Sequence, residues 1–334
     1  MSYRSTVARQ SESLADTLDA ARAELSELDL SPLASGLMAV TGIGASFAAA
    51  VVVAAELQRR GRRSFAVRSG EMMAGYDIAD TVLAVSHRGR SVETVQALQK
   101  LPKAKSLAIT NNPESPLAGA ATYHLRLNNG SDATPSSTGY TATLLAAGLA
   151  VDAIHGTGGA DWSTLSSITS EVQARAAEKM PRLAELFRER GAIDCVGAGA
   201  SIGTADGASL LIREAARIPA SGYETRHYLH GPMESMDATT GVVLFGDERE
   251  LALAQNLNDI GCPTLLVTSN TGISDTGKLT VVHVPSSEDL IMRAIIDIFT
   301  AQLLAAELSD AAGLTDVKFR YKQSDTKIVD PAVA

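Results

Sequence analysis

The 334-residue sequence is poor in the residues that mark several common classes of protein. It has two cysteines, Cys195 and Cys262, too few for a disulfide framework or a cysteine-ligated zinc site. No apolar run reaches the roughly 18 residues of a membrane span, and residues 1–25 contain no compact hydrophobic block typical of a signal peptide. We therefore expect a cytoplasmic protein without a membrane partner.

Positive charge and aromatic side chains are also scarce. Lys and Arg number 29 against 38 Asp and Glu, which gives a net charge of −9 without a basic cluster. A nucleic-acid partner is not expected, because phosphate binding along a duplex needs a positive stripe. Aromatic residues make up 4% of the chain, while Ala and Gly are abundant. Small side chains let helices lie close to a sheet, which favours a layered α/β fold.

Short apolar runs alternate with long Ala-rich stretches along the whole chain. This alternation is typical of βαβ units and predicts doubly wound α/β lobes with buried parallel sheets. The longest helices are predicted at 138–154, 163–190 and 287–308. The strands are predicted at 37–42, 64–67, 81–86, 105–110, 122–127, 192–197, 219–223, 241–245, 263–268 and 279–285.

Two segments of the first half recur in the second half. GIGASFA (42–48) matches GAGASIG (197–203), and SLAITNN (106–112) matches TLLVTSN (264–270) at nearly the same separation. Two independent matches indicate an internal duplication. The predicted organisation is an N-terminal helix at 1–34, a first lobe at 35–160, a second lobe with a long leading helix at 161–312, and a tail at 313–334.

Two loops of the first lobe are candidates for anion binding. Gly44 and Ser46 lie where a strand meets a helix N-terminus, whose free N–H groups favour an anion. This turn lacks the third glycine of the dinucleotide motif, so a dinucleotide cofactor is disfavoured. In AVSHRGRSVET, Ser86, Arg88 and Ser91 converge on one point, which suits a single phosphate. The alternative is that Ser91 only caps a helix and the arginines are solvated.

Three further features are weaker when each is taken alone. The loop at 131–141 is rich in hydroxyls and leads into a long helix. Glu214 lies in an Ala-rich apolar helix, where burial would raise its pKa toward that of a working acid–base, although such a residue is more often at a helix surface. His230 precedes Gly-Pro, so its ring can project into a cleft. His227, His230 and Glu234 lack further ligands, so no metal is expected.

Taken together, these pieces resemble the sugar isomerase (SIS) family over about residues 35–317. G-x-G-A-S follows the first strand, and S-x-x-G-x-S-x-E-T follows the third. REAARIPASGYETRHYLHGP (213–232) and AQLLAAELSDAAGLTDV (301–317) are similar to parts of the isomerase half of glucosamine-6-phosphate synthase. The resemblance implies two five-stranded parallel lobes with helices on both faces. It also implies a sugar-phosphate site at the carboxyl ends of the first lobe's strands.

The resemblance further implies a role for each matching residue. Glu214 would move a proton between C1 and C2, and Lys327 is the nearest match to a lysine that forms a Schiff base with the ketose. His230 would open the sugar ring from the partner subunit, so a homodimer is implied. No cofactor is implied. The residues that would hold the phosphate and the sugar are Gly44, Ser46, Ser86, His87, Arg88, Ser91, Ser137 and Thr138.

The sequence departs from the family pattern at several of these positions. Arg88 stands where the family loop S-x-S-G has a phosphate-binding hydroxyl, and Leu211 and Leu229 stand where the synthase has lysines. Lys327 matches the family lysine only after a two-residue shift, and we expect the tail that carries it to fold over the first-lobe site. The residues before 35 are too few for a glutaminase domain, so glutamine-dependent synthesis is not expected of this chain alone.

The leading hypothesis is an aldose–ketose isomerase that acts on a sugar phosphate. With an amino sugar this reaction becomes the deamination of glucosamine 6-phosphate to fructose 6-phosphate and ammonia. A non-catalytic sugar-phosphate-binding regulatory protein is the alternative, favoured by the altered phosphate loop and opposed by the retained Glu214 and His230. An etherase or lyase acting on a modified amino sugar is a third reading.

Overall fold

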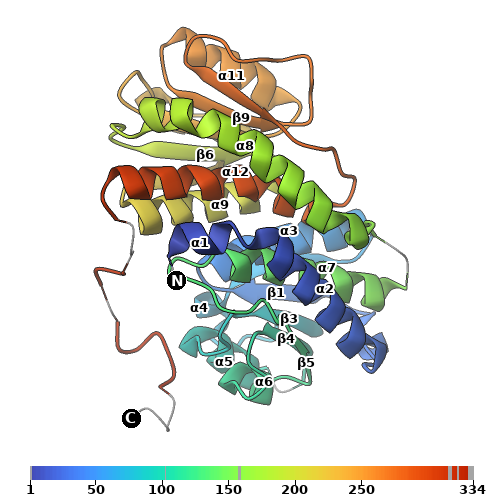
Figure 1. Ribbon diagram of the computed structural model, residues 1–334. Helices are drawn as coiled ribbons and strands as arrows, with labels where there is room; N and C mark the ends of the chain where they lie inside the picture. The colour runs from blue at the N-terminus through green and yellow to red at the C-terminus, as the bar shows by residue number, and fades with distance from the viewer. Residues whose placement is uncertain (1, 102, 157–158, 315–317, 322, 330–334) are drawn as a thin grey trace.

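The computed structural model describes residues 2–101, 103–156, 159–314, 318–321 and 323–329. They form two lobes, each built on a five-stranded parallel sheet (Figure 1). The first sheet has the order β2-β1-β3-β4-β5, and the second has the equivalent order β7-β6-β8-β9-β10. The strands are β1 (Met38–Gly42), β2 (Ser64–Arg68), β3 (Thr81–Val85), β4 (Lys105–Thr110), β5 (Tyr123–Arg126), β6 (Ile193–Gly197), β7 (Ala220–Glu224), β8 (Gly241–Phe245), β9 (Thr264–Thr268) and β10 (Leu279–His283). The predicted α/β class with two parallel-sheet lobes is confirmed.

The helices on the inner faces of the two sheets pack against each other between the lobes (Figure 1). They are α2 (Gln10–Ser26), α3 (Ala45–Arg59) and α7 (Thr138–His155) over the first sheet, and α8 (Leu165–Phe187), α9 (Ser201–Leu211) and α12 (Leu290–Ala311) over the second. Most of α12 is buried, and one apolar core runs through this layer into both sheets. The other α-helices are α1 (Tyr3–Val7), α4 (Ser69–Met72), α5 (Val92–Gln99), α6 (Pro116–Ala120), α10 (Thr225–Tyr228) and α11 (Arg249–Asp259).

The crossing of α3 and α9 brings the second lobe to the edge of the first lobe's sheet. A Cβ atom on Gly203 would lie 2.6 Å from the carbonyl oxygen of Ala48, so this close approach requires glycine. The C-terminal end of α9 thereby reaches the turn that precedes α3. Leu210 Cδ2 lies 3.8 Å from the position of a Cβ on Gly44. Glu214, three residues after the end of α9, therefore faces the carboxyl ends of the first sheet's strands.

The two glycine turns that repeat in the sequence adopt the same backbone geometry. Gly44 and Gly199 have φ angles of +59° and +56°. A Cβ on Gly42 would lie 2.7 Å from the backbone of Ser46, and a Cβ on Gly197 would lie 2.7 Å from the Cβ of Ser201. The duplication and the lobe boundaries remain predictions.

The predicted strands agree with the observed ones to within two residues at each end. The helix predicted at 163–190 is α8, which begins at Leu165 and ends at Phe187. Among the described residues, no helix combines the length and the apolar character needed to cross a membrane.

Candidate functional site

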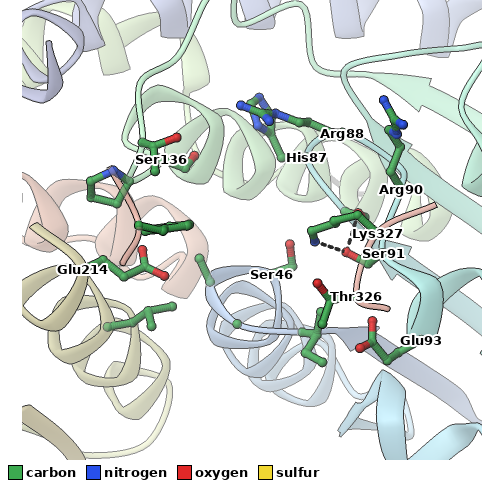
Figure 2. Close-up of a pocket in the computed structure, with 18 of the residues that line it drawn as sticks. Ser46, His87, Arg88, Arg90, Ser91, Glu93, Ser136, Glu214, Thr326 and Lys327 are labelled. Carbon is green, nitrogen blue, oxygen red and sulfur yellow. Dashed lines mark hydrogen bonds between the residues drawn. The ribbon is translucent and has the colours of Figure 1, made fainter. Parts of the chain in front are cut away.

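A cavity of about 520 Å³ lies at the carboxyl end of the first sheet, where loops of the first lobe meet the end of α9 and the C-terminal segment (Figure 2). This is the edge at which open parallel sheets bind ligands. The sequence-predicted residues that line it are Gly44, Ser46, Ser86, His87, Arg88, Ser91, Glu214 and Lys327.

The loop after β3 brings two hydroxyls together. The Ser86 hydroxyl donates a 3.3 Å hydrogen bond to the Ser91 hydroxyl, and both residues are 4% exposed. Gly89 has a φ of +64°, and a Cβ there would lie 2.1 Å from the Ser115 hydroxyl, so only glycine fits. Arg88 precedes this turn and is exposed at the cavity, where its guanidinium forms no ion pair with any described residue.

The C-terminal segment lies across the same loop. Ser91 and Lys327 form an antiparallel bridge, in which the amide N–H of Val92 donates to the carbonyl of Thr326 at 3.3 Å. The ammonium of Lys327 donates to the Ser91 hydroxyl at 2.8 Å. Burial lowers the pKa of Lys327, Glu93 opposes the shift and Arg88 adds to it. Hydroxyls, an ammonium and a guanidinium at one end of a cavity suit a phosphate.

Glu214 lies on the opposite side of the cavity from Ser91 and Lys327 (Figure 2). It belongs to a π-helical turn, Ile212–Ala216, that continues α9, and Arg217, with a φ of +59°, ends the helix. Such wider turns occur frequently at functional sites. Burial raises the pKa of the Glu214 carboxyl to about 7, and the charge of Arg213 opposes this shift. The carboxyl can thus take up and release a proton near neutral pH.

Ser137 and Thr138 differ from the prediction, because they lie outside the cavity lining. Both are fully buried and engaged elsewhere: the Ser137 hydroxyl donates to the Thr6 hydroxyl at 2.8 Å, and the Thr138 hydroxyl accepts from the Asn129 amide at 3.2 Å. Ser136, one residue earlier, lines the cavity instead.

Asp132 holds the loop that presents Ser136, and the sequence analysis did not single it out. Its carboxylate accepts hydrogen bonds from the Ser136 hydroxyl at 2.6 Å and from the backbone N–H groups of Ser137 and Gly139 at 3.0 and 2.8 Å. An acidic residue just before a helix within a hydroxyl-rich loop is the signal that could have identified it.

His87 belongs to the loop after β3, between Ser86 and Ser91. Its Nε2 is 3.0 Å from the side-chain oxygen of Asn129, and burial lowers its pKa, which favours the neutral ring. Ser136, Glu93 and Thr326 are lining residues that the sequence analysis did not predict.

His230 follows α10 on the second lobe. It is exposed and does not line the cavity, so within one chain the ring-opening histidine that the resemblance implies is not part of the site. Among the described residues, no group of three or more His, Cys, Asp and Glu side chains is arranged to hold a metal ion.

Comparison with known proteins agrees with this fold. Residues 35–154 match the family model of the SIS domain. The resemblance to the SIS family seen in the sequence is thus confirmed over these residues.

Its relatives include glutamine–fructose-6-phosphate aminotransferase (isomerizing) of Sulfolobus acidocaldarius, which is 25% identical over 79% of this chain and 47% of its own length. The chain spans about half the length of the curated relatives it matches.

Two solved structures have the same fold. One is the C-terminal domain of glucosamine-fructose-6-phosphate aminotransferase from Francisella tularensis, with a TM-score of 0.80, 17% identity, and coverage of 94% of this chain and 97% of that one. The other is glucosamine-6-phosphate deaminase from Thermotoga maritima, with a TM-score of 0.74, 20% identity, and coverage of 93% and 97%.

Proposed function

We propose that the protein is a phosphosugar isomerase that acts on an amino-sugar phosphate. The reaction is the deamination of glucosamine 6-phosphate, in which water is consumed and fructose 6-phosphate and ammonia are released. The observation that carries this proposal is Glu214: a carboxyl with a pKa of about 7 that faces a cluster of phosphate-binding groups across one cavity. The aminotransferase and deaminase names of its relatives support the substrate class.

The phosphate binds at the end of the cavity formed by the loop after β3. Ser46, Ser86 and Ser91 supply hydroxyls, and Arg88 and Lys327 supply positive charge. A substrate anchored there extends its C1 and C2 toward Glu214. His87 and Ser136 border the space between these two ends and hold sugar hydroxyls.

Glu214 moves the proton in this reaction. In its ionised form it takes the proton from C2 of the open-chain amino sugar, and it then returns a proton to C1, while a second proton moves from the nitrogen to the C1 oxygen. The product is the C2 imine of the ketose, which water hydrolyses to fructose 6-phosphate and ammonia. A carboxyl with a pKa near the working pH is suited to both steps, since it must act first as base and then as acid.

Two roles in this proposal come from the family resemblance. His230 opens the sugar ring in the partner subunit's site, so the active form is a homodimer. We place this homodimer in the cytoplasm. The resemblance implies that Lys327 forms an imine with the ketose, for which its amine must leave Ser91 and move toward C2 at the Glu214 end of the cavity. Its partly desolvated ammonium supports that role, because a lowered pKa makes more of the free amine available.

The second candidate function is a regulatory protein that binds a sugar phosphate without converting it. It is favoured by Arg88 in place of a hydroxyl and by Leu211 and Leu229 in place of the synthase lysines. It is opposed by the buried Glu214, because a binding protein needs no carboxyl of raised pKa.

One assay separates the two functions. The purified protein is incubated with glucosamine 6-phosphate, ammonia and fructose 6-phosphate are measured, and the ligand-induced change in Tm is recorded. Turnover supports the isomerase, whereas a rise in Tm without turnover supports the regulatory protein. The absence of both turnover and a rise in Tm would contradict both functions.

A further inference from the structure

A second cavity, of about 410 Å³, adjoins the first one at Glu214. Glu214 and Phe319 line both cavities, whereas the serines and Lys327 line only the first. The second cavity therefore begins at the Glu214 end of the first cavity, opposite the proposed phosphate site. We call it the basic cleft, and its lining residues are Arg213, Glu214, Arg217, Ile218, Pro219, Lys318, Phe319, Arg320 and Tyr321.

The positive charge of the basic cleft is only partly balanced by the protein, through the interaction of Arg213 with Glu214 and Asp206. Four of its residues, Arg213, Arg217, Lys318 and Arg320, are cationic, in a chain whose net charge is −9. Glu214 is the only acidic residue in its lining, and among the described residues none of the four cations forms an ion pair. Arg217 donates a 3.2 Å hydrogen bond to the carbonyl of Lys318, which ties the end of α9 to the C-terminal segment. Within the part of the chain that the structure describes, these four side chains donate no other hydrogen bond.

The arrangement of the two arginines supports a ligand. Arg213 lies within the π-helical turn of Glu214 and Arg217 ends it, so both arginines belong to the element that carries this carboxyl. A guanidinium binds a carboxylate or phosphate through two parallel hydrogen bonds, which a lone ammonium cannot do. The exposed rings of Phe319 and Tyr321 add apolar walls to the same cleft.

We propose that the basic cleft binds a second anionic group of the substrate, carried on the reacting end of the sugar. This inference rests on the proposed function, because it takes the phosphate to lie at Ser91 and C1–C2 to lie at Glu214. Glucosamine 6-phosphate remains a substrate of the proposed reaction, and the preferred substrate is a derivative of it whose nitrogen bears a short chain ending in a carboxylate or another anion. That derivative releases the corresponding amine in place of ammonia.

The test compares three ligands by calorimetry: glucosamine 6-phosphate, its N-carboxymethyl derivative, and the N-carbamoylmethyl derivative, which has the same size without the charge. We expect the carboxylate to bind about tenfold or more tightly than the neutral amide, because charge-assisted hydrogen bonds are the strong ones. Equal affinities of the two derivatives would overturn the second anion site alone. If none of the three ligands bound, the proposed function itself would fail.

Substitutions test whether the arginines of the basic cleft cause the preference for the carboxylate over the amide. Arg213→Gln with Arg217→Gln should abolish the preference for the carboxylate over the amide. Arg188→Gln is the matched control, since Arg188 is an exposed arginine outside both cavities, and it should keep the preference. A preference that persists in the double variant would contradict the proposal. The proposal would also be contradicted if the two derivatives bound with equal affinity and the double variant changed in oligomeric mass. The basic cleft would then be an interface with a second copy of the chain.

Discussion

The ammonium of Lys327 donates a 2.8 Å hydrogen bond to the hydroxyl of Ser91, a residue 236 positions earlier in the chain. This contact joins the C-terminal segment to the loop that the Ser86–Ser91 pair defines. It puts a cation where the proposed phosphate binds and closes one side of the cavity (Figure 2).

The first prediction concerns this ammonium. Lys327→Met should raise the KM for the sugar phosphate about tenfold or more, since it removes a charge-assisted contact to the phosphate. The control is Lys278→Met, an exposed lysine outside the cavity, which should leave KM unchanged. Equal KM values for Lys327→Met and wild type would place the ammonium outside the binding site.

Borohydride trapping with fructose 6-phosphate tests the imine separately. Wild type should be labelled covalently, and Lys327→Arg should not. Absence of label in both proteins would mean that Lys327 binds the phosphate but forms no imine. In that case the chemistry would run through Glu214 alone.

The second prediction uses two glycines with similar backbone angles. Gly61→Ala, with a φ of +81° and no atom within 4 Å of the new Cβ, should cost only the ~1–2 kcal/mol of a left-handed residue. Gly89→Ala has the same conformational cost and also forces its Cβ against Ser115, so it should destabilise more and raise KM. Urea unfolding and kinetics measure both effects. Equal destabilisation by the two variants would mean that the Ser115 contact does not fix the loop.

The third prediction concerns Asp132. Asp132→Asn replaces one acceptor oxygen by a donor, so one or more of the loop N–H and O–H groups loses its partner, at about 1–2 kcal/mol. We expect KM to rise more than kcat falls, because Ser136 is no longer held at the cavity. Asp161→Asn, which removes an equivalent turn contact on Ser163 far from the cavity lining, is the control. If both variants have wild-type KM, the loop does not contact the substrate.

The fourth prediction follows from the raised pKa of Glu214, about 7 against an ordinary 4.5. A folded state that holds a proton more tightly than the unfolded state is stabilised below pH 4.5 and loses that stability as the pH rises to 7. Glu214→Gln removes the buried charge, so its Tm should exceed that of wild type at pH 8 and match it at pH 4. A Tm difference that does not change with pH would contradict the raised pKa.

Most of the fold could be predicted from the sequence because parallel strands buried on both faces are continuous apolar runs bounded by turns. Gly241–Phe245 and Lys105–Thr110 were predicted to the residue. The raised pKa of Glu214 could also be predicted from the sequence, because its neighbours Leu210, Leu211, Ala215 and Ala216 offer little solvation.

The details of the site depend on contacts between distant segments, which no local pattern encodes. Ser136 and Ser137 are adjacent serines, and contacts with two other residues separate them: the Ser137 hydroxyl donates to Thr6 of α1, and the Ser136 hydroxyl donates to Asp132. The reach of Lys327 depends on its pairing with Ser91, and the basic cleft exists only because the C-terminal segment lies beside Arg217.

Transfer of the proton by Glu214 is tested most directly by measuring the rate of glucosamine 6-phosphate deamination by wild type and by Glu214→Gln. Glutamine keeps the size of the side chain and its hydrogen bonding but cannot accept the proton. The account predicts that kcat falls ~10²–10⁴-fold, while the rise in Tm caused by the ligand is retained. Near-normal turnover by Glu214→Gln would contradict it.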